Sequence, residues 1–141
     1  MSVLAVNGLS KAFRGVRAVS GVSFAVDAGE LLAMIGPNGA GKTTCFNMVN
    51  GQLAPDSGSI VLAGKNLVGK APREICRSGV GRTFQVTATF GSMTVRENVQ
   101  LALLSHARML GSLLSSMEKN FLNETYKLLE QVGVREQADR K

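Results

Sequence analysis

The chain has 141 residues, 45% of them hydrophobic and 18% charged, and its net charge is +6 at pH 7. This length suffices for one domain with a real core, and the composition is that of a globular protein rather than a disordered one. The sixteen Lys and Arg residues are scattered and form no basic patch interleaved with aromatics, so we expect a solvated surface and no nucleic acid partner.

Signals for export or for membrane insertion are absent. The start, MSVLAVNGLSKAF, has no basic region followed by a long apolar stretch. The longest unbroken apolar run is Leu31–Ile35, far short of the roughly 20 residues that cross a bilayer. Cys45 and Cys76 form no metal or redox spacing, and we expect both to be small buried hydrophobes in a reducing compartment. We therefore expect a cytoplasmic protein that reaches a membrane only through a partner.

Strands dominate the first part of the chain. Val3–Val6 alternates weakly and is predicted to be an edge strand. Ala18–Val26 alternates more clearly, with Gly21 as a bulge or bend. A turn then leads to a short apolar strand, Glu30–Ile35, which ends at Gly36.

Residues 36–44, GPNGAGKTT, match the phosphate-loop pattern G-x-x-x-x-G-K-[ST]. A helix over Gly41–Val49 follows without a breaker, so strand, glycine loop and helix come in the order that the motif requires. The glycines let successive N–H groups face one anion, and the helix adds the positive end of its dipole. We expect Lys42 to reach the β- and γ-phosphates and the Thr43 hydroxyl to ligate Mg²⁺. The other loop residues expected at the nucleotide are Gly36, Pro37, Asn38, Gly39, Ala40, Gly41 and Thr44.

The rest of the chain shifts from strands to helices near residue 85. A turn cluster at 54–59 precedes a strand over Ser59–Ala63, and Pro72 opens a helix over Arg73–Arg77. Gly79 to Phe84 is predicted to be another short strand.

Two longer helices are expected after the shift. Thr94–Met109 is amphipathic and starts with a capping box formed by Thr94 and Glu97. Leu113–Val132 follows, with Gly133 as its C-cap. The sequence thus indicates an α/β fold with a helical piece behind it.

The phosphate loop alone does not select one class of protein. A guanine-selecting N-K-x-D is absent, which argues against a common GTPase, and no acceptor site for a kinase is visible. Phe13 could stack on a nucleotide base, a contact worth about 1–3 kcal/mol, or could belong to the core.

Four features of the sequence belong together by their order and spacing: Leu9–Phe13 with Ala18-Val19, Gly36–Thr44, Pro55–Gly58 and Gly81–Gln85. In these features the chain resembles the ATP-binding subunits of ABC transporters. The last of them, GRTFQ, followed by Phe90 and by MTVREN at 93–98, looks like the branch that energises branched-chain amino acid importers. The resemblance implies a P-loop NTPase fold of the ABC type, incomplete, with an antiparallel β edge. It places a nucleotide-binding core over residues 1–90 and the start of a helical subdomain over residues 91–141.

The resemblance also implies roles for two residues outside the loop. Phe13 would stack on adenine, and Gln85 would sense the γ-phosphate and Mg²⁺ and signal to the membrane subunit. Without the family, Gln85 reads as a solvent-facing loop residue. Residues 86–95 would form part of the groove that docks the membrane partner. ATP and Mg²⁺ are the implied cofactors, and the implied partners are transmembrane permease subunits at the inner face of the cell membrane and a second ATPase subunit.

The family's catalytic parts are not found in this sequence. No LSGGQ-like signature is present, and none of Asp27, Asp56 and Asp139 follows an apolar strand in the way that a Mg²⁺-holding Asp with its neighbouring Glu would. His106 lies within a helix and cannot be the family's switch histidine. We therefore expect the front half of an ATPase, with no catalytic residue and without ATP hydrolysis on its own.

Two functional hypotheses remain. The first is the ATP-binding part of an ABC ATPase that energises uptake of branched-chain or other amino acids, with urea or short amides as further possible substrates. The alternative is a nucleotide-binding module that docks the membrane subunit without hydrolysing ATP. In either case the strand Leu31–Ile35 would lack parallel neighbours, so we also expect self-association, element swapping or marginal stability.

Overall fold

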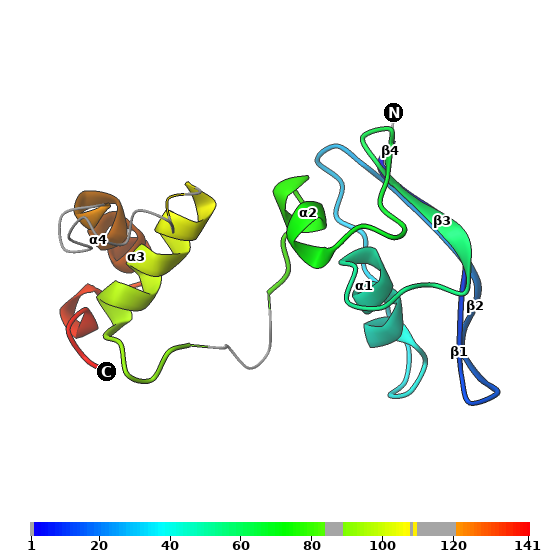
Figure 1. Ribbon diagram of the computed structural model, residues 1–141, viewed down its shortest axis with the longest axis horizontal. Coiled ribbons are helices and arrows are strands. Elements are labelled where there is room, and N and C mark those ends of the chain that lie inside the picture. The colour runs from blue at the N-terminus through cyan, green and yellow to red at the C-terminus, as the bar shows by residue number, and fades with distance from the viewer. Residues whose placement is uncertain (1, 84–88, 108, 110–120) are drawn as a thin grey trace. The chain divides into compact units, whose positions relative to one another are not determined.

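The computed structural model describes residues 2–83, 89–107, 109 and 121–141. These residues form two compact units, Met1–Thr83 and Phe84–Lys141 (Figure 1). Within the described ranges, no helix is long and apolar enough to span a bilayer. The functional division expected near residue 90 stays a prediction.

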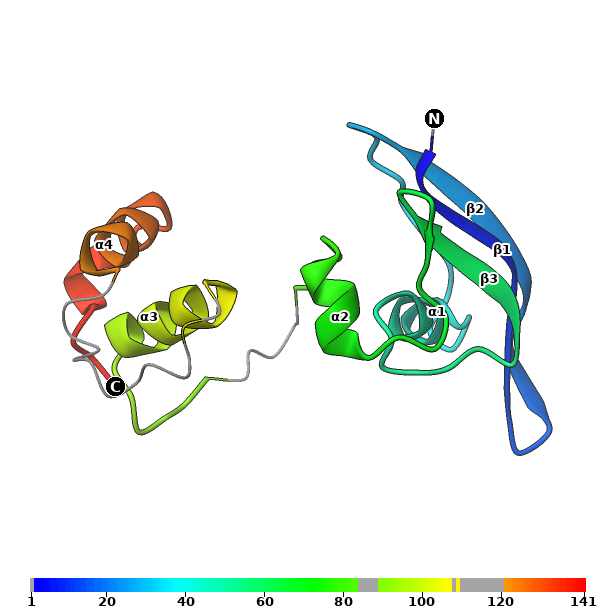
Figure 2. The same ribbon diagram turned by 45° about the horizontal axis from the view of Figure 1, so that its top comes forward.

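The first unit is built on an antiparallel sheet with the strand order β2-β1-β3-β4. Strands β2, β1 and β3 run side by side (Figure 2). The strands expected over Ala18–Val26 and Ser59–Ala63 are confirmed as β2 and β3. The edge strand expected at Val3–Val6 is wrong in length and place, because β1 is longer and pairs with β2 on one side and with β3 on the other. The strands are β1 (Ser2–Phe13), β2 (Val16–Asp27), β3 (Ser57–Leu62) and β4 (Lys65–Asn66).

The bulge predicted at Gly21 is confirmed. Leu9 pairs with Val22 whereas Lys11 pairs with Val19, so β2 carries one extra residue at this point. Gly21 has φ 64, a left-handed conformation that glycine adopts without strain.

Helix α1 (Lys42–Val49) lies against the sheet, and the short helix α2 (Pro72–Arg77) beside it adds Ile75 to the same buried core (Figure 2). Cys45 is buried as expected, and burial raises the pKa of its thiol. Cys76 is exposed, so the expectation that it is buried was wrong. Its neighbour Ile75 takes the core-facing position of α2, and one residue along a helix turns the side chain by about 100°. The buried cluster consists of Val6, Leu9, Val19, Cys45, Met48, Val49, Ile60, Leu67 and Ile75.

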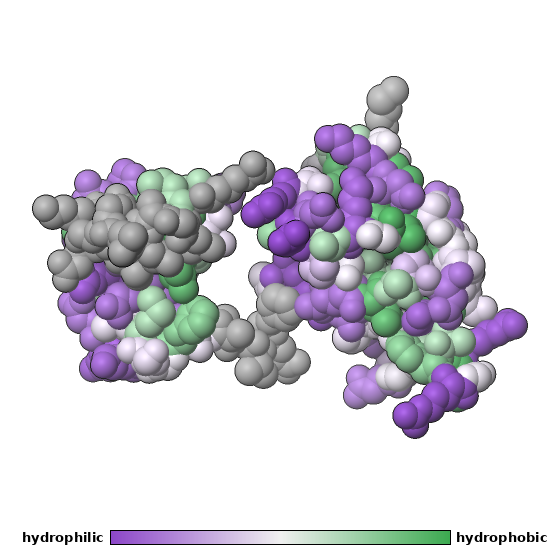
Figure 3. Space-filling view, in the orientation of Figure 1, coloured by the Kyte–Doolittle hydropathy of each residue, from purple (hydrophilic) through white to green (hydrophobic). Residues whose placement is uncertain are grey.

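Two predicted strands are not formed. The backbone from Glu30 to Ile35 has no regular structure, and Leu31 and Ile35 are 96% and 90% exposed. An apolar strand of this kind is stabilised by parallel neighbours, and no described strand lies beside it. Hydrophobic surface is visible on this unit in Figure 3. At the other segment, Gly79 (φ 106) stops α2, because its N–H and the N–H of Val80 bond back to that helix, and the residues up to Thr83 are irregular.

The second unit contains α3 (Val95–His106), α4 (Leu122–Gln131) and a 3₁₀ turn, Arg135–Gln137. The predicted capping box is confirmed, since Thr94 Oγ1 accepts from the Glu97 N–H (3.2 Å) and the Glu97 carboxylate accepts from the Thr94 N–H (2.7 Å). Gly133 ends α4 as predicted, with φ 72 and its N–H bonded to the Glu130 carbonyl. The start expected for this helix, at residue 113, lies outside the described residues.

Candidate functional site

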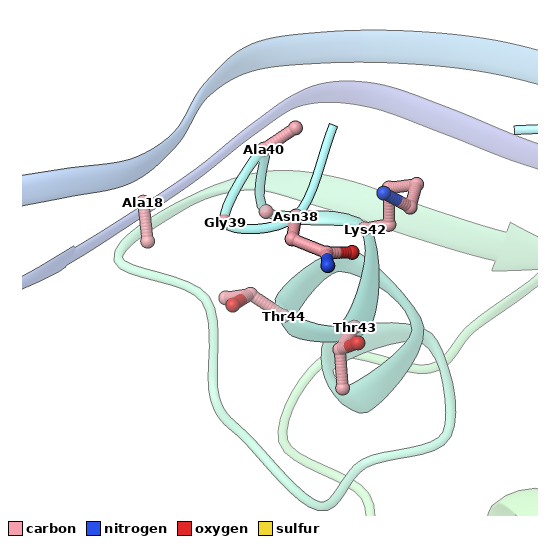
Figure 4. Close-up of a pocket in the computed structure, with 8 residues that line it drawn as sticks. Ala18, Asn38, Gly39, Ala40, Lys42, Thr43 and Thr44 are labelled. Carbon is pink, nitrogen blue, oxygen red and sulfur yellow. The ribbon is translucent and has the colours of Figure 1, made fainter. Parts of the chain in front are cut away.

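A pocket of about 210 Å³ lies at the N-terminus of α1. Every residue that lines it belongs to the predicted phosphate loop except Ala18, which comes from β2. Figure 4 shows the Thr44 side chain pointing toward Ala18 and the Asn38 amide lying over the first turn of α1. The loop residues that line the pocket are Asn38, Gly39, Ala40, Gly41, Lys42, Thr43 and Thr44.

Helix α1 opens without a cap of its own. Gly41 occupies the N-cap position, no side chain caps the helix, and its first turn holds no acidic residue. The first N–H groups of an α-helix have no partner within the helix, and they carry the positive end of its dipole. The pocket therefore presents backbone donors and partial positive charge, which suits an anion.

Gly41 meets two constraints at once. Its φ of 84 is left-handed, and a Cβ added there would lie 2.2 Å from the Ala18 carbonyl oxygen and 3.1 Å from Val19 Cγ2. Gly39 has nearly the same φ, 83, but faces open space. The backbone of the loop thus rests directly on β2 at Gly41, and only glycine permits that approach.

Lys42 holds the loop closed. Its ammonium donates to the main-chain carbonyls of Gly36 (2.6 Å) and Pro37 (2.8 Å). The Ala40 N–H also donates to the Pro37 carbonyl, at 3.2 Å. Through these bonds Gly36 and Pro37 join the loop residues that line the pocket. A phosphate would offer Lys42 charged acceptors in place of neutral carbonyls, and charge-assisted hydrogen bonds are the stronger kind.

Phe13 lies at the end of β1, where it pairs with Val16, and it is 45% exposed. It does not line the pocket at α1. Its partner Val16 lies two residues, or about 7 Å, before Ala18 along β2, and Ala18 lines that pocket. Phe13 therefore lies on the neighbouring strand, close to the pocket. An aromatic ring with half its surface open, near the pocket, suits stacking better than a place in the core.

The metal-binding predictions have a narrower basis in the structure. Thr43 lines the pocket, while Gln85 falls in 84–88, outside the described residues. No group of three or more His, Cys, Asp and Glu side chains suited to a metal occurs in the part of the chain that the structure describes.

Sequence reasoning missed Asp56. Its Oδ1 accepts from the Lys11 ammonium (2.6 Å) and its Oδ2 from the Ala12 N–H (2.8 Å). These hydrogen bonds, the one from Lys11 first, hold the pKa of the carboxyl below its usual range. The turn around Pro55 was visible in the sequence, but nothing there names a partner so far upstream.

Comparisons with known proteins agree on one family. A profile of the family described as "ABC transporter" matches residues 19–141. The branched-chain amino acid transport ATP-binding protein LivG of Salmonella typhimurium is 40% identical over 147 residues, covering 98% of this chain and 57% of its own length. The protein BraF of Pseudomonas aeruginosa, also named for branched-chain amino acid transport, is 44% identical over 104 residues, covering 74% of this chain and 41% of its own length.

Solved structures agree with the sequence matches. An ATP-binding cassette of an ABC transporter in its ADP conformation superposes with a TM-score of 0.79 at 32% identity, covering 100% of this chain and 57% of that one. A nucleotide-free cassette gives 0.79 at 31% identity. The match covers 57% of the length of LivG and 41% of the length of BraF, so the chain spans only part of the curated relatives that it matches.

Proposed function

The chain belongs to the ABC transporter family, and we propose that it is the N-terminal, nucleotide-binding part of an ATPase that energises amino acid uptake. The observation that carries the proposal is the uncapped N-terminus of α1 inside a pocket lined by phosphate-loop residues, with Lys42 within reach. In this proposal Met1–Thr83 is part of the nucleotide-binding core, and the helices after residue 91 begin the helical subdomain.

A triphosphate fits the donors that the loop offers. The N–H groups at the start of α1 and in the loop would face its oxygens, and the Lys42 ammonium would exchange the Gly36 and Pro37 carbonyls for the β- and γ-phosphates. The Thr44 hydroxyl, which opens into the same space, would contact the α-phosphate. The Phe13 ring would stack on the adenine.

Magnesium is part of the proposal through Thr43 and Gln85. These two residues would hold the ion, which would supply positive charge to offset that of the phosphates. This ion keeps several waters and takes few protein ligands when phosphates are present, so one hydroxyl in the pocket is a sufficient protein contribution at this end of the site.

Branched-chain amino acids lead as the transported substrate, because LivG and BraF carry that assignment in their names. Other amino acids, urea and short amides follow. The proposed partners are transmembrane permease subunits, through which the protein would lie at the inner face of the cell membrane, and a second ATPase subunit.

An Mg-ATP titration, with phosphate release followed in the same samples, tests the proposal. We expect binding that Lys42→Ala abolishes and that Lys65→Ala, which removes the same charge from β4, leaves unchanged. No binding by the unaltered chain, or equal binding by the Lys42 variant, would refute the nucleotide site. Binding without phosphate release is what the alternative, a nucleotide-binding module that does not hydrolyse ATP, also predicts. Release that Lys42→Ala abolishes would exclude that alternative and would require a catalytic carboxylate in this chain.

A further inference from the structure

The end of β1 has a sheet partner on one side only. β1 pairs with β2 through Phe13, but its pairing with β3 stops at Ser10, opposite Ser57. Beyond that point the hairpin is a two-stranded ribbon, an arrangement that is only marginally stable without further contacts.

Asp56, the residue just before β3, makes the next contacts with β1 beyond the end of the β1–β3 pairing. Its main-chain N–H donates to the Ser10 carbonyl (2.9 Å), and its carboxylate accepts from the Lys11 ammonium and the Ala12 N–H. The contacts therefore continue along β1 residue by residue, with a side chain in place of a backbone ladder. Two of them are charge-assisted, which makes them stronger than the neutral bonds that they replace.

The contact with Lys11 also reaches the aromatic ring. The Lys11 ammonium, paired with Asp56, lies 5.9 Å from the centre of the Phe13 ring. The Lys11 side chain is only 16% exposed, so its place is fixed on one side by the carboxylate and on the other by the ring. Phe13 directly follows Ala12, whose N–H donates to the Asp56 carboxylate.

We propose that Asp56 is a positioning residue that fixes the Lys11–Phe13 segment, and with it the Phe13 ring, for stacking on the base of the bound nucleotide. This inference rests on the proposed function. Holding the ring before the ligand arrives reduces the ordering that binding must supply, and the gain falls on the base alone. Asp56 thereby contributes to the preference for a nucleotide over free polyphosphate, although it touches neither.

The experiment compares Mg-ATP with Mg-tripolyphosphate, by calorimetric titration of the full chain. Stacking of about 1–3 kcal/mol means that Phe13→Ala should weaken ATP by about 5- to 150-fold and tripolyphosphate by less than about twofold. Asp56→Ala should show the same selectivity, with a loss of ATP affinity from about threefold up to that of the Phe13 variant. Asp139→Ala removes the same charge, together with an ion pair to Arg96, from an exposed position in the second unit, and should change the affinity for neither ligand.

The double variant decides the mechanism. If Asp56 acts through the ring, removing Asp56 in a chain that already lacks the ring should cost no further ATP affinity. Asp56→Asn keeps the shape and one acceptor, and should fall between the unaltered chain and Asp56→Ala. It also serves as the variant to read if Asp56→Ala loses the exchange protection of the β1 amides.

Three results would overturn the inference. The first is an equal loss of affinity for ATP and tripolyphosphate in the Asp56 variants, and the second is additive losses of ATP affinity in the double variant. The third is an unchanged ATP affinity in the Asp56 variants when Phe13→Ala loses affinity for ATP selectively. An unaltered chain that binds tripolyphosphate but gains nothing from the base would refute the role of Phe13, and the inference with it. An unaltered chain that binds neither ligand would refute the proposed function itself.

Discussion

Gly41→Ala tests whether the phosphate loop is seated on β2 by direct backbone contact. The new methyl would lie 2.2 Å from the Ala18 carbonyl oxygen, a separation that real Cβ atoms do not show, and that oxygen belongs to backbone that cannot swing aside. A left-handed alanine costs about 1–2 kcal/mol on its own. Forcing extra volume into a packed contact adds about 1–3 kcal/mol. We therefore expect the first unit to lose about 2–5 kcal/mol of its free energy of unfolding.

Gly39→Ala is the matched control. Its φ of 83 is nearly that of Gly41, but a methyl there meets nothing within 4 Å. It should therefore pay the conformational cost alone, about 1–2 kcal/mol. The difference between the two variants isolates the contact with β2.

Amide hydrogen exchange of the β1 and β2 peptides reads this unit separately from the helical one. Thermal denaturation gives a second measure, since 1 kcal/mol shifts the melting temperature by about 4–8 °C in a domain of this size. Gly41→Ala should also weaken the binding of Mg-ATP, because the loop must move away from β2 to accommodate the methyl group. Equal losses of stability in the two variants would show that the loop does not rest on β2 and would refute the reasoning.

Three further predictions concern the rest of the chain. The hydrogen bonds that Thr94 donates, that of its N–H first, lower the pKa of the Glu97 carboxyl. The stability that they give α3 should therefore be complete above the ordinary pKa of 4.5 and be lost as the pH falls through the lower pKa of the folded state. Exchange protection of the α3 amides should fall at that pH, and Glu97→Gln should abolish this pH dependence. Gly133→Ala should destabilise the second unit by about 1–2 kcal/mol in urea denaturation, because its φ of 72 is left-handed and its surroundings are open; no loss would mean that α4 does not end on that residue. Leu31→Ser with Ile35→Ser should reduce self-association in light scattering, because these side chains are 96% and 90% exposed; an unaltered chain that is a clean monomer would contradict this expectation.

Elements whose information is local were predictable from the sequence. The capping box at Thr94 and Glu97, the stop at Gly133 and the bulge at Gly21 each depend on a few neighbouring residues, and all three are present. The phosphate loop belongs to the same class, because the glycine positions and the following helix are both encoded within it.

Elements that depend on distant partners were not predictable. Glu30–Ile35 has the composition of a buried strand, but a strand needs a neighbour, and none lies beside it among the described residues. Cys76 was expected in the core, and only the orientation of α2 decides that Ile75 takes that place. The hydrogen bond between Asp56 and Ala12 joins a turn to the end of a strand far upstream, so no local sequence pattern predicts it.

The unpaired segment before the loop also gives the molecule a weak point. Proteases bind their substrates as extended, accessible chain, and exposed segments without backbone pairing are where nicking concentrates. Within the first unit, a protease that cuts after large apolar residues should therefore cleave at Leu31 or Leu32 ahead of sites in the paired strands. In the sequence, the cut would fall after the β1–β2 hairpin and before β3. Strands β1 and β3 would then belong to different pieces but would still pair with each other in the sheet. The two pieces should then separate on a denaturing gel and stay together in native solution.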